Sequence, residues 1–498
     1  MMSNPLTRTK SVEQSIADTD EPGTRLRKAL TWRDLTVFGV SVVIGAGIFS
    51  VTASQAGDKA GPSISLAFLM AAVACALAAL CYAEFASVVP VAGSAYTFSY
   101  ATFGELAAWI IGWDLILEMA VGAATVAKNW SLYLGQLFGF SGGVSRVGGH
   151  DIDWGALIVI GAVTGVVAIG VKLSSTVSAV ITAIKVAVVI FIIVVGAFYI
   201  KTGNYSPFIP KSEPGSKGAW ADSSLFQLMS GGGTSSYGVY GMLAAASVVF
   251  FAFIGFDIVA TTAEETKNPQ KDVPRGIFAS LGIVTVLYVL TTLVVTGMVK
   301  YTDLKTHGKD KATLATAFHI VGLGWAEKLI SLGALAGLTT VVMVLVIGQI
   351  RVLFAMSRDG LLPRQLAKTN RNGTPVRITL IVGLLVAIAA TVFPVNRLEE
   401  MVNVGTLFAF VLVAAGVWIL RVRRPDLKRG FTVPWMPLIP ILAIAACLWL
   451  MLNLTALTWI RFGVWMAIGM VLYFGYSMRH SVLARRERDP DRAPTPAA

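Results

Sequence analysis

The sequence predicts an all-α integral membrane protein with twelve transmembrane helices. Three observations predict this fold class. The chain of 498 residues is 55% hydrophobic and only 14% charged, whereas a soluble chain carries about a quarter charged residues. Its apolar residues gather in runs of 18 or more, which is long enough for a helix to cross ~30 Å of hydrocarbon. Short polar segments separate these runs, as expected for loops outside a membrane.

The expected spans are of similar length and follow one another along the whole chain. They fall near residues 34–57, 63–88, 104–132, 154–172, 176–200, 243–263, 275–299, 328–356, 376–394, 401–420, 435–453 and 459–478. The polar, charged segments 1–32 and 481–498 predict a flexible N-terminus and a disordered tail. Because the number of spans is even, we expect both termini on the same side of the membrane.

The distribution of Lys and Arg indicates which side that is. If the termini are cytoplasmic, 26 of the 40 Lys and Arg residues fall in cytoplasmic segments. Positive residues collect on the cytoplasmic side of membrane proteins, so we predict a multi-pass protein of the cell membrane with both termini inside. The net charge of +12 then reflects topology and the anionic inner leaflet. It does not indicate nucleic-acid binding, because no DNA- or RNA-binding motif accompanies it.

Two spans are interrupted at membrane depth. The stretch VVIGAGIFS in the first span contains Gly45 and Gly47, and FFAFIGFD in the sixth contains Gly255 beside Asp257. Counting 1.5 Å per residue, Gly45 lies ~17 Å from the inner end of its span and Gly255 lies ~18 Å from the outer end of its span. Non-helical backbone survives in a membrane only where protein covers it or where it lines a cavity. Breaks in spans 1 and 6 therefore favour two inverted five-helix repeats with a substrate site between them.

This interpretation divides the chain into six parts. They are a cytoplasmic N-terminus (1–32), a first repeat of five spans (33–200), an extracellular loop (201–242), a second repeat of five spans (243–420), two extra C-terminal spans (421–480) and a cytoplasmic tail (481–498). The glycines of the first span have two alternative roles. Close helix packing through small residues remains open. A dinucleotide-binding loop is disfavoured, because position 50 is Ser and no soluble βαβ unit surrounds it.

A broken helix frees backbone groups that can bind a zwitterion. Freed N–H groups at the start of a half-helix attract a carboxylate, and freed carbonyls attract an ammonium group. The predicted groups are the amides of Gly45, Ala46 and Gly47 for the carboxylate and the carbonyls of Phe251, Ala252 and Ile254 for the ammonium group. Both together match the backbone of an α-amino acid.

Ionisable residues inside spans are costly and indicate function. Lys185 in the fifth span, Glu118 in the third and Asp257 in the sixth lie near mid-depth. Burial disfavours the charged form of a lysine, so Lys185 is a candidate proton carrier whose ammonium could also contact carbonyls freed in span 1. Tyr288 could relay a hydrogen bond, or simply pack. Asp114, nearer the inner end, has no assigned role.

The remaining reactive residue types indicate neither a cofactor nor an enzyme. Cys75, Cys81 and Cys447 all lie in apolar spans without metal-like spacing, which is typical of small buried side chains. The four His residues are scattered in or near loops. No nucleophile, base and oxyanion group can be assembled. We therefore predict no cofactor, no metal site and no enzymatic activity.

Four stretches resemble one family of transporters. They are VVIGAGIF around residues 43–49, VPVAGSAYTFSYATFGELAAWIIGW (89–113), FFAFIGFDIVATTAEETKNPQKDVPRGI (250–277) and RVLFAMSRDGLLP (351–363). They resemble the amino acid–polyamine–organocation superfamily and, within it, bacterial members of the cationic amino acid transporter family. The resemblance covers about residues 30–480. It implies the five-plus-five LeuT-like fold, alternating access, and amino acid uptake with a proton. It also implies that Lys185, in the context AIKVAVV, replaces a sodium site.

The predicted side-chain pocket favours small neutral amino acids such as alanine. It comprises Val43, Ala46, Phe251, Ile254 and Leu338, and Ile44 completes the substrate-binding set. A cationic substrate remains an alternative, because Glu118 and Asp257 could supply negative charge through water. An amino acid exchanger is a further alternative, and a channel is disfavoured because no ring of charged pore residues is present. Binding of an accessory membrane subunit or a sterol stays open.

Overall fold

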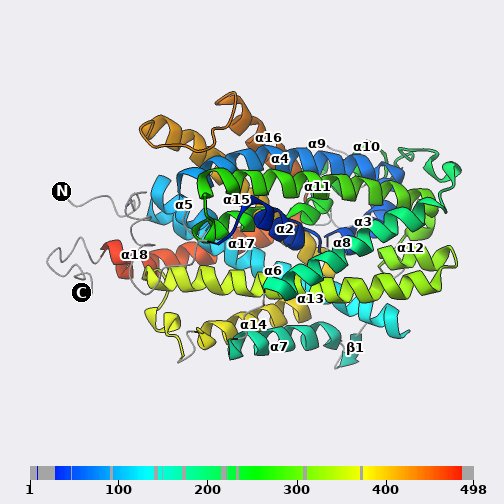
Figure 1. Ribbon diagram of the computed structural model, residues 1–498, viewed down its shortest axis with the longest axis horizontal. Coiled ribbons are helices and arrows are strands. Elements are labelled where there is room, and N and C mark those ends of the chain that lie inside the picture. Colours follow the sequence, from blue (N-terminus) through cyan, green and yellow to red (C-terminus); the bar gives the residue numbers. More distant parts are fainter. Residues whose placement is uncertain are drawn as a thin grey trace.

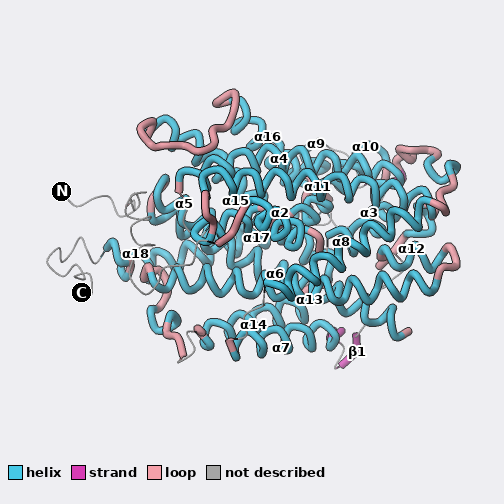
Figure 2. The backbone as a smooth tube through the Cα atoms, viewed as in Figure 1, coloured by secondary structure: helices cyan, strands magenta, loops and turns pink. Residues whose placement is uncertain are grey.

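The computed structural model describes residues 8, 29–45, 47–89, 94–139, 144–147, 150–170, 175–214, 220, 223–230, 235–306, 311–370 and 374–484. Most of the predicted N-terminal segment and C-terminal tail lies outside these residues, as does Ala46. The described residues form an elongated helical bundle whose long helices follow the long axis of the molecule (Figure 1). Loops gather mainly at the two ends of this bundle (Figure 2).

The helices include both long apolar rods and short connecting turns. The α-helices are α2 (Trp32–Val43), α3 (Thr52–Gln55), α4 (Ile64–Val88), α5 (Ser94–Thr102), α6 (Glu105–Phe138), α7 (Trp154–Ile169), α8 (Ser175–Ala197), α9 (Leu225–Ser230), α10 (Gly238–Val249), α11 (Pro269–Met298), α12 (Leu314–Ile320), α13 (Gly324–Arg358), α14 (Val376–Val392), α15 (Val395–Arg423), α16 (Leu438–Leu452), α17 (Ala456–Leu472) and α18 (Met478–His480). Two small antiparallel pairs of strands join β1 (Val144–Val147) to β2 (His150–Asp153) and β3 (Glu213–Pro214) to β4 (Ser235–Ser236).

Wider π turns and tighter 3-10 turns interrupt or extend some of these helices. The π turns are Gly47–Val51, Ala56–Ala60 and Tyr473–Ser477, and the 3-10 turns are Gly61–Ser63, Thr202–Tyr205, Phe250–Phe253, Asp257–Glu265, Tyr301–Leu304 and Arg364–Ala367. Several of them lie in the first and sixth expected spans. Helices α5, α9 and α12 and both strand pairs were not predicted, because short polar elements carry no hydropathy signal.

The helical, membrane-spanning class is confirmed. In the described part of the chain, eight stretches are long and apolar enough to cross a membrane, and one of them, Trp32–Val88, contains the first two expected spans. The expected spans at 154–172, 376–394 and 435–453 correspond to the shorter apolar helices α7, α14 and α16. Each has 15 to 17 residues, or about 23–26 Å. The count of twelve therefore remains a prediction.

Glycine and proline explain why these three helices are short. Helix α7 ends at Gly170, whose φ of 86° is left-handed and easily adopted only by glycine. Helix α14 lies between Pro375 and Pro394, and α16 begins after Pro437. A proline cannot continue a helix toward its N-terminal side without losing a hydrogen bond. Local sequence thus limits these helices to less than the full hydrocarbon thickness.

Two long helices form the centre of the bundle. Helix α6 packs against α13 and α15, and it is buried along most of its 34 residues. Helix α4 packs against α11, which in turn contacts α2 and α8. Figure 1 shows α2 in front of this core, while α7 and α14 lie side by side at one edge. The first span is thereby held against helices from both halves of the chain.

The described parts near both chain ends meet at one end of the bundle. The Arg8 carbonyl accepts a hydrogen bond from the Glu105 amide at 2.8 Å, and the Arg8 guanidinium reaches the Met478 carbonyl at 3.5 Å. We call this the terminal end. The opposite end, which we call the far end, contains α12 and β1 (Figure 1). This arrangement agrees with an even number of spans.

A buried ion pair holds the segment before α12 to the bundle. Lys311 Nζ lies 2.5 Å from Glu399 Oε1 on α15, and the side chains are 4% and 1% exposed. The Thr313 hydroxyl donates to Gln136 Oε1 on α6 at 3.0 Å. These contacts link the α12 segment to two different helices at the far end.

Removing one member of this pair is expected to destabilise the fold. Glu399→Gln leaves the Lys311 ammonium buried without a counter-charge. The free energy of unfolding should therefore fall by about 3–5 kcal/mol. Equilibrium unfolding in mixed micelles measures it. The control is Glu213→Gln, because Glu213 and Lys305 form an exposed pair of the kind that contributes about 0–1 kcal/mol. Equal, small decreases in the free energy of unfolding of Glu399→Gln and Glu213→Gln would contradict a structural role for the buried pair.

Candidate functional site

The first span is broken where the sequence predicts. Helix α2 ends at Val43, and Ile44 is extended, with φ −69° and ψ 94°. The chain becomes helical again in the π turn that begins at Gly47. The break therefore separates two half-helices. The last carbonyls of α2 lose the backbone N–H groups, four residues later in the chain, that would donate hydrogen bonds to them in a continuous helix.

The sixth span is broken in a matching way. Helix α10 gives way to the turn Phe250–Phe253, after which Ile254 is extended with φ −62° and ψ 136°. Gly255 has φ +119°, a conformation that side chains with a Cβ rarely adopt. Its amide donates to Asp257 Oδ1 at 3.3 Å, so the acid beside the break stabilises the turn.

The two breaks touch each other. A Cβ added to Gly47 would lie 2.1 Å from Ala252 Cα, and one added to Gly255 would lie 2.6 Å from Val42 Cγ1. Only glycine permits so close an approach of the two backbones. The packing alternative is therefore correct for Gly47, although this residue also lines a pocket. The close packing of Gly47 against Ala252 and its position at the pocket both result from the contact between the two helix breaks.

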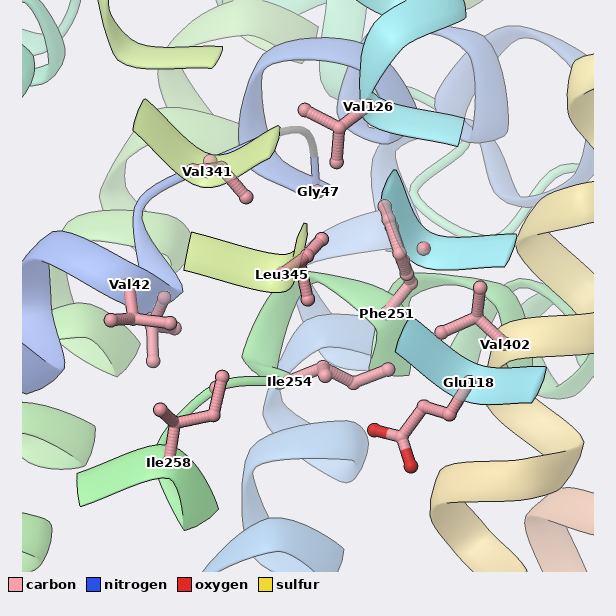
Figure 3. Close-up of a pocket in the computed structure, with 14 residues that line it drawn as sticks. Val42, Gly47, Glu118, Val126, Phe251, Ile254, Ile258, Val341, Leu345 and Val402 are labelled. Atoms are coloured by element: carbon pink, nitrogen blue, oxygen red, sulfur yellow. The ribbon is translucent and has the colours of Figure 1, made fainter. Parts of the chain in front are cut away.

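A buried pocket lies at this crossing (Figure 3). It is lined by Val42, Val43, Gly45, Gly47, Glu118, Gly122, Val126, Phe251, Ile254, Gly255, Ile258, Val341, Leu345 and Val402. The lining comes from both broken spans and from α6, α13 and α15. Figure 3 shows the Glu118 side chain reaching from α6 toward Ile254. Glu118 is the only ionisable residue among the lining residues, so the walls are otherwise apolar.

The pocket includes some predicted site residues and not others. Val43, Gly45, Gly47, Phe251, Ile254 and Glu118 line it, whereas Ile44, Ala252, Leu338, Lys185, Tyr288 and Asp257 do not. On α13 the lining residues are Val341 and Leu345, which follow Leu338 by three and seven positions. They share a helix face with Leu338, so the predicted residue lies on the correct face of α13 but at a different depth.

Several lining residues carried no sequence signal. Gly122 and Val126 on α6 and Val402 on α15 are small or apolar residues within apolar spans. Nothing distinguishes such residues from lipid-facing or core residues until the orientation of each helix is known. These three residues could therefore not be predicted from the sequence.

Lys185 contacts the broken helix directly. Its Nζ donates to the Ser41 carbonyl in the last turn of α2 at 2.8 Å, and the residue is only 1% exposed. Gly337 makes room for the aliphatic stem, since a Cβ there would lie 3.0 Å from Lys185 Cγ. The lysine thus connects α8 to a carbonyl that the helix break leaves free.

Tyr288 makes a second contact of the same kind. Its hydroxyl donates to the Val43 carbonyl at 2.8 Å, and the residue is fully buried. Donors from α8 and α11 therefore satisfy two carbonyls at the end of α2. Together they fix the position of the half-helix that leads into the pocket.

The described residues contain no cluster suited to a metal ion. No group of three or more His, Cys, Asp or Glu side chains is positioned to hold one within the described ranges. Cys75, Cys81 and Cys447 are free thiols and buried. The groups at the site are therefore backbone dipoles, apolar side chains, a buried lysine and buried carboxyls.

Two broken helices that cross at a pocket in a bundle of apolar helices are typical of a membrane transport protein. The chain belongs to the amino acid permease family, whose pattern matches residues 30–475. This confirms the resemblance to the amino acid–polyamine–organocation superfamily.

Individual relatives differ in the substrates that their names state. The chain is 40% identical to the methylthioribose transporter of Bacillus subtilis (strain 168) over 92% of this chain and 95% of that protein. It is 40% identical to the branched-chain amino acid permease BcaP of the same organism over 97% of this chain and all of that protein. It is 39% identical to the vacuolar cationic amino acid transporter 2 of Arabidopsis thaliana over 84% of this chain and 64% of that protein.

Proposed function

We propose that this protein imports neutral apolar L-amino acids, from alanine to the branched aliphatic ones, by proton symport with alternating access. The observation that carries the proposal is the apolar pocket at the crossing of the two breaks. Val341, Leu345 and Val402 suit an aliphatic side chain. The similarity to a branched-chain amino acid permease supports the same substrate class.

The backbone of the substrate is held by the broken helices. The amides from Gly45 to Gly47 bind the carboxylate, because the start of a half-helix carries a positive dipole. The carbonyls near Phe251 and Ile254 bind the ammonium group. These two segments meet at the pocket, which supports this arrangement in a fold of twelve spans and two inverted repeats.

The terminal end faces the cytoplasm in this proposal. The excess of Lys and Arg in the segments on that side supports the orientation. The pocket includes Val42 and Ile258, which belong to the halves of spans 1 and 6 nearer the terminal end. Substrate therefore leaves toward the cytoplasm along these two residues.

Lys185 couples the proton to this movement. The protonated side chain holds α2 through the Ser41 carbonyl, where an ammonium replaces a sodium ion. When the proton leaves, the charge-assisted hydrogen bond weakens, and the inner half of span 1 is released. Tyr288 retains the neighbouring Val43 carbonyl and limits the displacement.

Uptake into proteoliposomes tests the proposal. Labelled alanine and leucine should accumulate when the external medium is acidified, without sodium and without internal amino acid. An absolute requirement for sodium would remove the proton symport proposal. An absolute requirement for internal amino acid would identify an exchanger instead.

One observation favours a second candidate function, the transport of cationic amino acids. Glu118 places a carboxyl at the pocket, and the Arabidopsis relative is named for cationic substrates. Competition against labelled leucine uptake separates the candidates. We expect inhibition by isoleucine and valine and little by arginine; strong inhibition by arginine would favour the second function. Methylthioribose belongs in the same panel, because one relative is named for it.

Leu345→Ala is expected to change which side chains the pocket accepts. Removing this wall should raise the ratio of phenylalanine to valine uptake about tenfold, since a change of a few methylenes is worth about 1–3 kcal/mol in such a pocket. Ratios of kcat/KM measure the effect. The control is Leu335→Ala, a buried residue of the same helix outside the lining. Leu338→Ala tests the residue that the sequence predicted in place of Leu345. If the ratio of phenylalanine to valine uptake changes in Leu338→Ala alone, Leu338 is the residue that limits the size of the substrate side chain.

A further inference from the structure

Asp114 on α6 is a buried acid that the proposed function does not use. It is fully buried, and neither carboxyl oxygen has a hydrogen-bond partner among the described residues. It lies nine residues from the start of α6, about 14 Å along the helix axis. This acid is therefore located between the pocket and the terminal end.

The fold makes specific room for this carboxyl. Helix α15 presents Gly405 to it, and a Cβ there would lie 2.9 Å from Asp114 Oδ1 and 3.7 Å from Glu118 Cβ. Glu118 is one turn further along α6 on the same face and lines the pocket. The two carboxyls thus follow one another from the pocket toward the terminal end, beside a glycine.

In the described part of the chain, the charge that acts on the buried Asp114 is that of Glu118, which has the same sign. Helix α13 contributes neutral groups near this part of α6: Gln349 donates to the Ile116 carbonyl, and Met356 faces Gly112. A carboxylate buried with an acidic neighbour and no partner is strongly unfavourable, so this position suits the neutral acid form of Asp114.

Glu118 is arranged to exchange a proton with its surroundings. Thr406 on α15 is a neighbour of Glu118, and its hydroxyl donates to the Val402 carbonyl at 3.1 Å. Since a hydroxyl has a single proton to donate, Thr406 can accept from a protonated Glu118 while it bonds to Val402. Thr406 can therefore also serve as a hydrogen-bond partner for the neutral, protonated form of Glu118.

We propose that Asp114 is a second proton-binding site, which takes a proton from Glu118 and passes it toward the cytoplasm. The O–H bond of Glu118 breaks and an O–H bond of Asp114 forms, with water bridging the two carboxyls where needed. No other bond changes. The inference rests on the proposed proton symport and adds a route toward the cytoplasm for a proton that Glu118 has bound at the pocket.

Asp114→Asn tests this site in the full-length protein reconstituted in proteoliposomes. Asparagine resembles the protonated acid in shape but cannot release a proton. Acid-driven accumulation of labelled leucine, and the accompanying proton influx reported by an internal pH dye, should both fall at least tenfold. Leucine counterflow at equal internal and external pH should stay within twofold of the wild type, because exchange moves no net proton.

Three further variants keep the result interpretable. Asp114→Glu should restore part of the proton influx. Gly405→Ala, which places a methyl group against the carboxyl, should reduce proton influx while leaving α6 unchanged. The matched control is Glu105→Gln on the same helix, because that buried acid already bonds to Tyr100 and Tyr473; its proton influx should stay near the wild-type value.

The outcomes separate this inference from the proposed function. If acid drives uptake in the wild type and equally in Asp114→Asn, Asp114 is not a proton-binding site of the cycle. The proposal of proton symport is unaffected by that result. Equal loss of uptake and counterflow in Asp114→Asn, with no rescue by Asp114→Glu, also overturns it and indicates a structural role. A wild type that shows no acid-driven uptake overturns both proposals.

Discussion

Lys185→Ala is expected to abolish the accumulation of substrate driven by an inward proton gradient. The substitution removes the donor to the Ser41 carbonyl and the group that carries the proton in the proposed cycle. Accumulation should fall at least tenfold, whereas counterflow should persist at a reduced rate, since the pocket lining does not include Lys185. Labelled leucine uptake into acidified and unacidified proteoliposomes measures the difference.

Lys128 offers a matched control for this experiment. Its Nζ also donates to a helix carbonyl, that of Ala390, at 2.9 Å, but it has an acidic neighbour, Asp153, at 3.9 Å. Lys128→Ala should keep the dependence on external acid. Acid-driven uptake at the wild-type level in Lys185→Ala would reject the coupling role, and loss in both variants would indicate a general effect on the fold.

Gly47→Ala is expected to weaken substrate binding strongly. The new methyl group would lie 2.1 Å from Ala252 Cα and 2.8 Å from the Ala252 amide nitrogen, and backbone atoms of a second helix cannot move aside cheaply. Overpacking of this kind costs about 1–3 kcal/mol or more, and 1.4 kcal/mol corresponds to a factor of about ten in affinity. The Kd for leucine should therefore rise more than tenfold.

Two other glycines test whether this effect is specific to the crossing. Gly122 also lines the pocket, but a Cβ there would make ordinary contact with Leu345 at 3.5 Å. Gly161 on α7 has open space within 4 Å, so Gly161→Ala should stabilise its helix by about 0.5–1 kcal/mol. Leucine affinity near the wild-type value in Gly47→Ala would show that the two breaks do not form the binding site.

The fold class could be predicted because its causes are local. Apolar runs predict membrane helices whatever their neighbours are, and glycines within such runs weaken a helix wherever it packs. The breaks around Gly45 and Gly255, the burial of Lys185 and the family were therefore visible in the sequence. The apolar runs predict twelve spans, and glycine and proline shorten the helices of three of them, α7, α14 and α16, so the count of twelve remains a prediction.

The binding site itself depends on how the helices are rotated and shifted against one another. The choice of Val341 and Leu345 over Leu338 depends on the depth at which α13 packs. Val126 and Val402 resemble any other apolar residue of a span until α6 and α15 are oriented. The partners of Lys185 and Tyr288, the carbonyls of Ser41 and Val43, are backbone atoms that carry no sequence signal.

The sequence by itself thus determined the class of protein, the two helix breaks and the buried charges, because each follows from the chemistry of a few consecutive residues. Only the tertiary structure decided which apolar side chains surround the pocket, and that Asp114 and Glu118 lie in series beside Gly405. Those features result from contacts between residues hundreds of positions apart. Such contacts are fixed by the packing of whole helices, which no short stretch of sequence contains.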